Sequence, residues 1–157
     1  MEIAFSKRTS VEEVEEGFEL QPKFDEKGLI PVITIDNDDG KVLMHGYMNE
    51  EALKLTISLK TAHYWSRSRK KIWKKGETSG FFQNIVKIQI DDDQDCIILF
   101  VELSGTKASC HVGYKSCFYR ELEKKDENFS TNLVFNEEKK VFDPEKVYKG
   151  LENPTKL

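Results

Sequence analysis

Four carboxylates and a thiol stand together at Asp91, Asp92, Asp93, Asp95 and Cys96, directly before an apolar run. Charge of this density at the start of a buried strand is costly unless a group of opposite charge pairs with it. In an extended segment alternate side chains share one face, so Asp91, Asp93 and Asp95 would point the same way, about 7 Å apart in succession. Hard divalent cations such as Mg²⁺ prefer oxygen ligands of this kind. We therefore predict a magnesium site, against the alternative of a solvated acidic turn.

The chain has only two further cysteines, Cys110 and Cys117, and His111 follows the first of them. Three is an odd number, whereas secreted disulfide frameworks normally use an even one, and clustered thiols in a reducing cytosol are more often metal ligands or catalytic groups. Together with Cys96 they can supply three thiolates to Zn²⁺ and leave a fourth position for water, whose pKa zinc lowers to about 7. His111 would then act as general base or substrate contact. The alternative is that the cysteines are small core side chains.

A basic segment over residues 67–75 contains no acidic residue and runs into Gly76-Glu77-Thr78-Ser79-Gly80. Backbone amides and hydroxyl groups in such a loop can cradle a phosphate, and tryptophan can stack on a base. The alternative is a solvated edge strand protected by lysines. The residues that we expect to contact substrate are Arg67, Arg69, Trp73, Lys75, Thr78, Ser79 and Gly80.

These residues depend on a framework of strands and one main helix. Asn49 is a good N-cap for a helix over 50–60, with Ala52, Leu53, Ile57 and Leu59 on its inner face. The continuous apolar run at 97–103 predicts a central strand. A shorter helix is predicted over 11–17, and further strands over 29–35, 41–48, 63–69 and 85–90, with a loop over 73–80. The pattern predicts an α+β fold, mostly an antiparallel sheet with one main helix.

Length and charge limit the remaining possibilities. The 157 residues suggest one domain, divided into an N-terminal extension (1–21), a catalytic domain (22–120) and a charged tail (121–157) that can form a hairpin around 136–140. A net charge of −4 argues against nucleic-acid binding through bulk charge. No apolar stretch approaches the roughly 20 residues that span a membrane, and the N-terminus lacks the apolar region of a secretory signal. A cytoplasmic location is the default expectation.

Several separated blocks resemble one family, the phosphoribosyl-AMP cyclohydrolases of histidine biosynthesis. The resemblance covers about residues 22–120, in order and at family-like spacing. The matching blocks are 24–31, 42–53, Tyr64-Trp65-Ser66-Arg67-Ser68-Arg69, Trp73 to Gly80, the aspartate cluster, 108–113 and 116–120.

This resemblance implies a metal-dependent hydrolase that opens the adenine ring of 1-(5-phosphoribosyl)-AMP at the N1–C6 bond, with zinc-bound hydroxide as nucleophile. It implies an intertwined homodimer with one Zn²⁺ per subunit in a site shared between subunits, together with Mg²⁺. By position Asp91, Asp93 and Asp95 take the magnesium role, Cys110 and Cys117 the zinc role, and His111 that of base or proton shuttle. The 37 residues after Arg120 are too few for the helical pyrophosphohydrolase domain that is often fused to this activity, so we expect a monofunctional enzyme.

One position departs from the family pattern. The family usually reads Asp-Cys-Asp-x-Asp, whereas Asp92 stands here in place of that cysteine and Cys96 follows the last aspartate. On a regular strand residues 92 and 96 would share a face but lie about 13 Å apart. We predict that Cys96 supplies the third zinc ligand, because a thiolate is the softer ligand, with Asp92 as the alternative. A second hypothesis for the whole chain is a structural zinc domain that binds nucleotide or RNA phosphates without catalysis.

Overall fold

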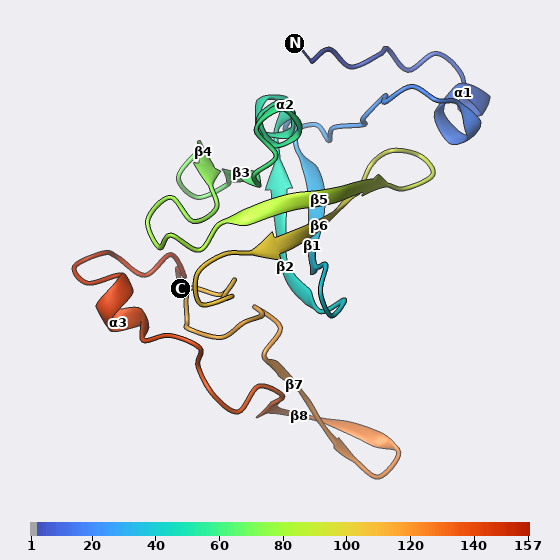
Figure 1. Ribbon diagram of the computed structural model, residues 1–157. Coiled ribbons are helices and arrows are strands. Elements are labelled where there is room, and N and C mark those ends of the chain that lie inside the picture. Colours follow the sequence, from blue (N-terminus) through green and yellow to red (C-terminus); the bar gives the residue numbers. More distant parts are fainter. Residues whose placement is uncertain (1–2) are drawn as a thin grey trace.

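A four-stranded sheet forms the centre of the computed structural model, which describes residues 3–157 (Figure 1). Its strands lie in the order β2 (Val42–Met48), β1 (Ile30–Asp36), β6 (Ile97–Leu103) and β5 (Gln83–Ile90). Only the pairing of β1 with β6 is parallel, and the other two pairings are antiparallel. The predicted α+β class with mostly antiparallel pairing is confirmed.

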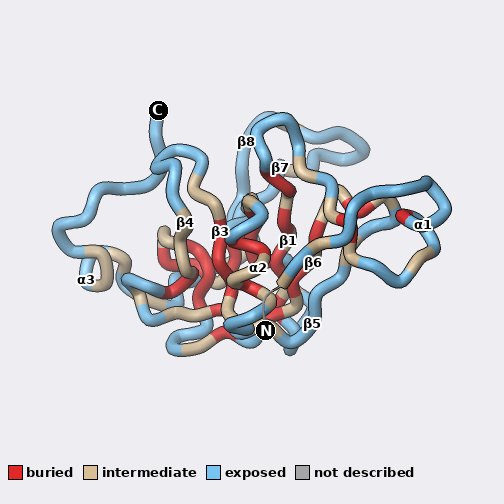
Figure 2. The backbone as a smooth tube through the Cα atoms, turned by 90° about the horizontal axis from the view of Figure 1, so that it is seen from above, coloured by how far each residue is buried: buried red, intermediate tan, exposed pale blue. Residues whose placement is uncertain are grey.

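The hydrophobic core lies on one face of this sheet. Along β1 and β6 the inward residues are fully buried and alternate with half-buried ones, which confirms the central position expected for 97–103. Helix α2 (Glu50–Leu59) and the hairpin of β3 (His63–Ser66) and β4 (Lys71–Lys74) cover the core. Figure 2 shows the buried stretches gathered around the sheet, β3 and α2, with exposed segments at the periphery. Within residues 3–157, no helix is both long and apolar enough to cross a membrane.

Helix α2 begins where the sequence predicts and its inner face differs at two positions. The Asn49 side chain accepts a hydrogen bond from the Ala52 amide at 2.9 Å, which satisfies an otherwise unpaired N–H of the first turn. Leu59 is 56% exposed, so its assignment to the inner face is wrong. Thr56 is buried instead, because its hydroxyl bonds the Ala52 carbonyl at 2.8 Å and accepts the His63 amide at 3.0 Å, which ties the helix to β3.

Three predicted boundaries shift in the structure. The strand expected over 63–69 ends at Ser66, because the chain turns there and Lys70 takes a left-handed conformation (φ 51°). The strand β4 occupies 71–74, so the loop expected over 73–80 begins two residues later. The strand β5 starts at Gln83 rather than Ile85. Short helices lie at both ends of the chain, α1 (Val11–Glu16), as predicted for 11–17, and α3 (Pro144–Val147).

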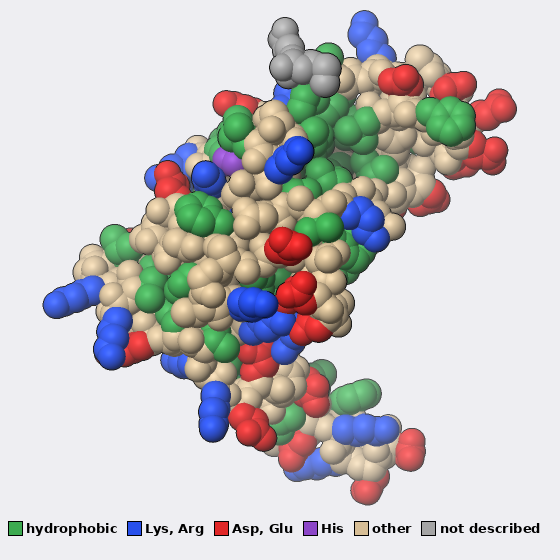
Figure 3. Space-filling model, in the orientation of Figure 1, with side chains coloured by type: hydrophobic (Ala, Val, Ile, Leu, Met, Phe, Trp, Pro, Cys, Tyr) green, Lys and Arg blue, Asp and Glu red, His purple; other side chains and the backbone are tan. Residues whose placement is uncertain are grey.

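The C-terminal residues form a hairpin in a different place from the one predicted. Strands β7 (Arg120–Lys125) and β8 (Asn128–Phe135) pair around Asp126, which adopts a left-handed φ of 54°, whereas 136–140 forms no hairpin turn. The hairpin projects from the body and carries basic, acidic and apolar side chains (Figure 3). The chain then returns to the body, where the Val141 amide bonds the Gly113 carbonyl at 2.8 Å.

Candidate metal and substrate site

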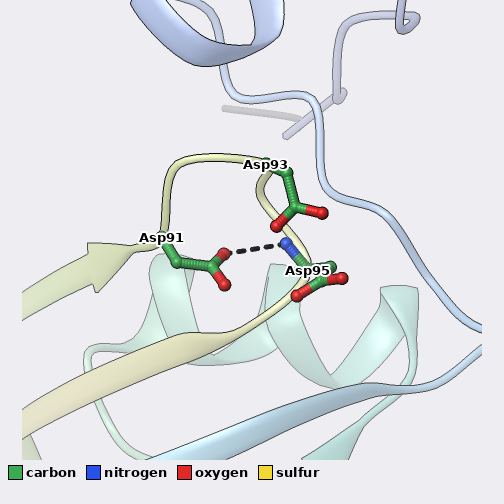
Figure 4. A group of neighbouring side chains, drawn as sticks. All are labelled: Asp91, Asp93 and Asp95. Carbon is green, nitrogen blue, oxygen red and sulfur yellow. Dashed lines mark hydrogen bonds between the residues drawn. The ribbon is translucent and has the colours of Figure 1, made fainter.

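The three aspartates predicted to bind magnesium lie together in the turn between β5 and β6. One carboxylate oxygen from each aspartate lies within 4.8 Å of those from the other two (Figure 4). The segment is a turn rather than the expected extended strand, since the Asp91 carboxylate accepts the amides of Asp95 and Cys96, both at 2.9 Å. The turn gathers the carboxylates more closely than the 7 Å spacing of a strand, which suits a hard cation with oxygen ligands.

The electrostatics of this turn favour a bound cation. Desolvation, followed by the charges of Asp93 and Asp91, raises the pKa of Asp95 above its usual value. The Lys23 ammonium lies 3.4 Å from the Asp93 carboxylate and 3.5 Å from that of Asp95. The side chains of Lys23, Asp93 and Asp95 are 41–53% exposed, so solvent screens these ion pairs. The ion pairs therefore offset the repulsion between the carboxylates only in part.

Gln94 holds the aspartate turn against the N-terminal extension, a role that the sequence did not reveal. Gln94 adopts a left-handed φ of 58° and is 5% exposed. Its side-chain amide donates to the Val14 carbonyl at 2.9 Å and its side-chain oxygen accepts the Gln21 amide at 2.6 Å. The geometry of the carboxylates therefore depends on residues that are some seventy positions earlier in the chain.

Two of the three predicted zinc ligands, Cys110 and Cys117, form a thiol pair whose members lie close enough to shift each other's pKa. The interaction with the Cys117 thiol, together with the Val112 amide and the charge of Lys75, lowers the pKa of Cys110 to about 7. The same interaction, followed by desolvation of the sulfur, raises the pKa of Cys117, although the residue as a whole is exposed. One proton of the pair is therefore held much less tightly than the other, and a metal that binds both sulfurs must displace both.

The third predicted ligand, Cys96, lies in the aspartate turn. Its pKa is raised by desolvation and by the charges of Asp91 and Asp95, and the other cysteines do not contribute to this shift. Within residues 3–157, the three aspartates form the only group of three or more His, Cys, Asp or Glu ligand atoms close enough to hold one metal ion. One chain therefore brings together two of the three predicted zinc ligands, and neither Cys96 nor Asp92 joins them.

Two elements fix the loop that carries the thiol pair. The Cys117 amide donates to the Leu43 carbonyl of β2 at 2.7 Å. The Glu137 carboxylate, from the C-terminal segment, accepts the amides of Lys115 and Ser116 at 2.9 and 3.0 Å. Glu137 also pairs with Lys41 at 2.7 Å, and its side chain is 9% exposed. The sequence signal for Glu137 is weak, because it lies in a charged stretch with no motif.

His111 has the properties of a general base. It is half-buried, and burial followed by the charge of Lys75 lowers its pKa, although an interaction with Asn153 acts in the opposite direction. The ring is therefore mainly neutral at neutral pH. Its Nε2 atom is buried and has no hydrogen-bond partner among the described residues. A neutral imidazole with an unused buried nitrogen is ready to accept or deliver a proton.

The predicted substrate residues divide into an exposed set and an inner set. Arg67 lies over the Tyr47 ring at 4.3 Å and Arg69 over the Trp73 ring at 5.7 Å, and both arginines are exposed. Lys75 points inward and is 7% exposed. Thr78 and Gly80 are exposed, and the half-buried Ser79 accepts the Phe81 amide at 3.1 Å.

Gly76 allows the loop that follows β4 to turn sharply after Lys75. Its φ is +91°, and an added Cβ would lie 2.6 Å from the Phe82 nitrogen. Only glycine fits this conformation and this close approach of two backbone segments. The glycine therefore fixes the path by which Lys75 enters the interior.

Comparison with known proteins identifies the family. A family model described as phosphoribosyl-AMP cyclohydrolase matches residues 44–119. A Rhizobium rhizogenes phosphoribosyl-AMP cyclohydrolase is 48% identical over 90% of this chain and 93% of its own length. The chain belongs to the phosphoribosyl-AMP cyclohydrolase family. Relatives of the same name from Methanoregula boonei (54% identity, 82% of this chain and 95% of the relative) and Brucella canis (53%, 69% and 78%) agree. The protein is thus a hydrolase of histidine biosynthesis.

Proposed function

We propose that this cyclohydrolase opens the adenine ring of phosphoribosyl-AMP at the N1–C6 bond with Zn²⁺ at the cysteines and Mg²⁺ at Asp91, Asp93 and Asp95. The observation that carries the proposal is the Cys110–Cys117 thiol pair together with the buried, unpartnered Nε2 of His111, the residue that follows Cys110 in the chain. Zinc, when bound there, would supply an activated water as the nucleophile for the ring carbon. The donor sets fit the two metals, because thiolates suit zinc and a carboxylate triad suits magnesium.

The residues of the chain have separate tasks in this reaction. His111 is neutral at neutral pH and adjoins a zinc ligand, so it can take a proton from the attacking water and return it to the ring nitrogen that leaves. The exposed Arg67 and Arg69 offer cations for the phosphates, and each guanidinium is already held over an aromatic ring. The half-buried Trp73 is available to stack on the base.

The zinc site is completed in this proposal by Cys96 of a second copy of the chain. Support comes from the thiol pair, which has no third ligand within residues 3–157. Support also comes from the sheet face opposite the core, where Ile33 pairs in register with Ile98 and Ile35 with Phe100, all half-buried. A half-open apolar face of this kind suits a symmetric interface between two copies, whose two-fold symmetry would create two shared sites.

Subunit mixing tests this assignment. Cys96→Ser and Cys110→Ser should each bind less zinc and turn over no phosphoribosyl-AMP when assayed alone. Dissociating and reassociating an equal mixture should restore about a quarter of wild-type activity, since half of the dimers are mixed and each mixed dimer has one complete site. Asp92→Ala, which changes the alternative ligand beside Cys96, should retain zinc.

Three results would contradict the proposal. If the mixture stays inactive although mixed dimers form, the three ligands belong to one chain. If Asp92→Ala loses zinc while Cys96→Ser keeps it, the oxygen ligand is the correct one. If the wild type holds zinc but shows no Mg²⁺-dependent turnover, the structural zinc domain is the better interpretation.

A further inference from the structure

Lys75 is a buried cation without a carboxylate partner. It is 7% exposed, and its Nζ atom donates to the Ser109 carbonyl at 2.5 Å and lies 5.1 Å from the centre of the Trp73 ring. None of the ion pairs between described residues includes it. Lysine is almost never buried unless it is paired, because an ammonium out of water needs a compensating charge.

The groups that can compensate this charge are the two thiols. The Ser109 carbonyl, which accepts the hydrogen bond from the ammonium, directly precedes Cys110 in the chain, and Cys110 forms the thiol pair with Cys117. The cation and the sulfurs therefore stabilise each other when the sulfurs are ionised.

A rigid frame keeps Lys75 in this place. The Gln83 side chain donates to the Ser109 hydroxyl at 2.9 Å, and the Lys75 amide donates to the Ala62 carbonyl at 3.0 Å. Gly76 follows in a conformation that only glycine adopts easily. The ammonium is thus held at the loop that carries the thiols, whereas Arg67 and Arg69 are exposed.

We propose that Lys75 is a positioning residue of the zinc centre, whose ammonium balances the negative charge of the zinc-binding thiolates instead of contacting a substrate phosphate. The inference rests on the zinc site of the proposed function. Three thiolates and one Zn²⁺ carry a net charge of −1, which one buried ammonium neutralises. A partner of this kind outside the ligand set tunes and retains a metal.

The experiment compares zinc-loaded full-length protein with its Lys75→Met and Lys75→Gln variants, and with Lys107→Met as a control that removes an exposed positive charge. Zinc affinity is measured by competition with a chelator, and thermal midpoints are measured with and without zinc. We expect both Lys75 variants to bind zinc about 10- to 100-fold more weakly. The metal-free midpoint should stay equal or rise, because the variants no longer bury an ammonium, while the zinc-loaded midpoint should fall.

Three outcomes overturn the proposal. Unchanged zinc affinity with a raised KM would make Lys75 a phosphate contact. Wild-type affinity in Lys75→Gln alone would assign the effect to the Ser109 hydrogen bond, and equal falls of both midpoints would assign it to packing. Turnover by the wild type is scored separately: zinc binding that depends on Lys75 in a protein without turnover would refute the proposed function and leave this inference intact.

Discussion

Replacing Tyr64 with phenylalanine should lower the free energy of unfolding, because it leaves two buried polar atoms without hydrogen-bond partners. Tyr64 is 1% exposed, and its hydroxyl donates to the Gln83 side-chain oxygen at 2.7 Å. The same hydroxyl lies 2.6 Å from Thr34 Oγ1, and because its only proton goes to Gln83, Thr34 is the donor. Gln83 in turn holds Ser109 beside Cys110. The hydroxyl is therefore the centre of a chain that runs from the sheet to the thiol loop.

The size of the effect follows from the groups left behind. Tyr64→Phe leaves the Thr34 hydroxyl and the Gln83 oxygen without partners in a dry core. Each such group costs about 1–3 kcal/mol, so we expect a loss of roughly 2–6 kcal/mol in the free energy of unfolding. Thr34→Val alone should cost only about 1 kcal/mol, since the Tyr64–Gln83 bond survives. In the Tyr64→Phe background the Thr34 change removes an unpaired donor and should recover about 1 kcal/mol.

Urea unfolding of the wild type, the two single variants and the double variant measures this cycle. The decisive feature is the change of sign: Thr34→Val destabilises the wild type and stabilises the Tyr64→Phe protein. Additive costs would show that the hydroxyls do not depend on each other and would refute the reasoning. A Tyr64→Phe loss below about 0.5 kcal/mol, the lower limit for a typical hydrogen bond, would do the same.

Three further predictions concern the site and its supports. Gly76→Ala places a Cβ 2.6 Å from the Phe82 nitrogen at a φ of +91°, so we expect little folded protein by circular dichroism. Glu137→Ala frees two amides of the thiol loop and should lower the free energy of unfolding by about 2–3 kcal/mol in urea. The hydrogen bond from Lys115 lowers the pKa of Asp39 in the folded protein. The stabilisation of the fold by ionised Asp39 is therefore present above its unfolded pKa of 3.8 and is lost as the pH falls through the lower folded pKa. The difference in stability between wild type and Asp39→Asn should shrink over that range.

The elements with strong local signals were predictable from the sequence. The apolar run 97–103 and the Asn49 cap define β6 and α2 with little help from the rest of the chain, and both lie where expected. Cys110 and Cys117 could be proposed as zinc ligands because two thiols and a histidine in one short loop are chemically unusual. The structure then brings the two thiols close enough to shift each other's pKa.

The errors arose where distant contacts decide the backbone. An acidic segment before a strand fits an extended chain, but Gln94 bonds to Val14 and Gln21 and bends 91–96 into a turn. The β7–β8 hairpin has mainly charged or exposed side chains, so no hydrophobic period marked its strands. The burial of Lys75 was also invisible, since five basic neighbours made it look like part of a solvated patch.

The departure from the family pattern at Asp92 and Cys96 has a different meaning in a turn than on a strand. On a strand the two residues would lie about 13 Å apart, and a ligand at one position could not replace a ligand at the other. In the turn the Cys96 amide bonds back to the Asp91 carboxylate at 2.9 Å, which brings residue 96 next to the start of the cluster. A cysteine can therefore stand at position 96 instead of position 92 and still belong to the same turn. If the third zinc ligand comes from this turn in a second copy, the magnesium and zinc sites share one rigid element across the dimer.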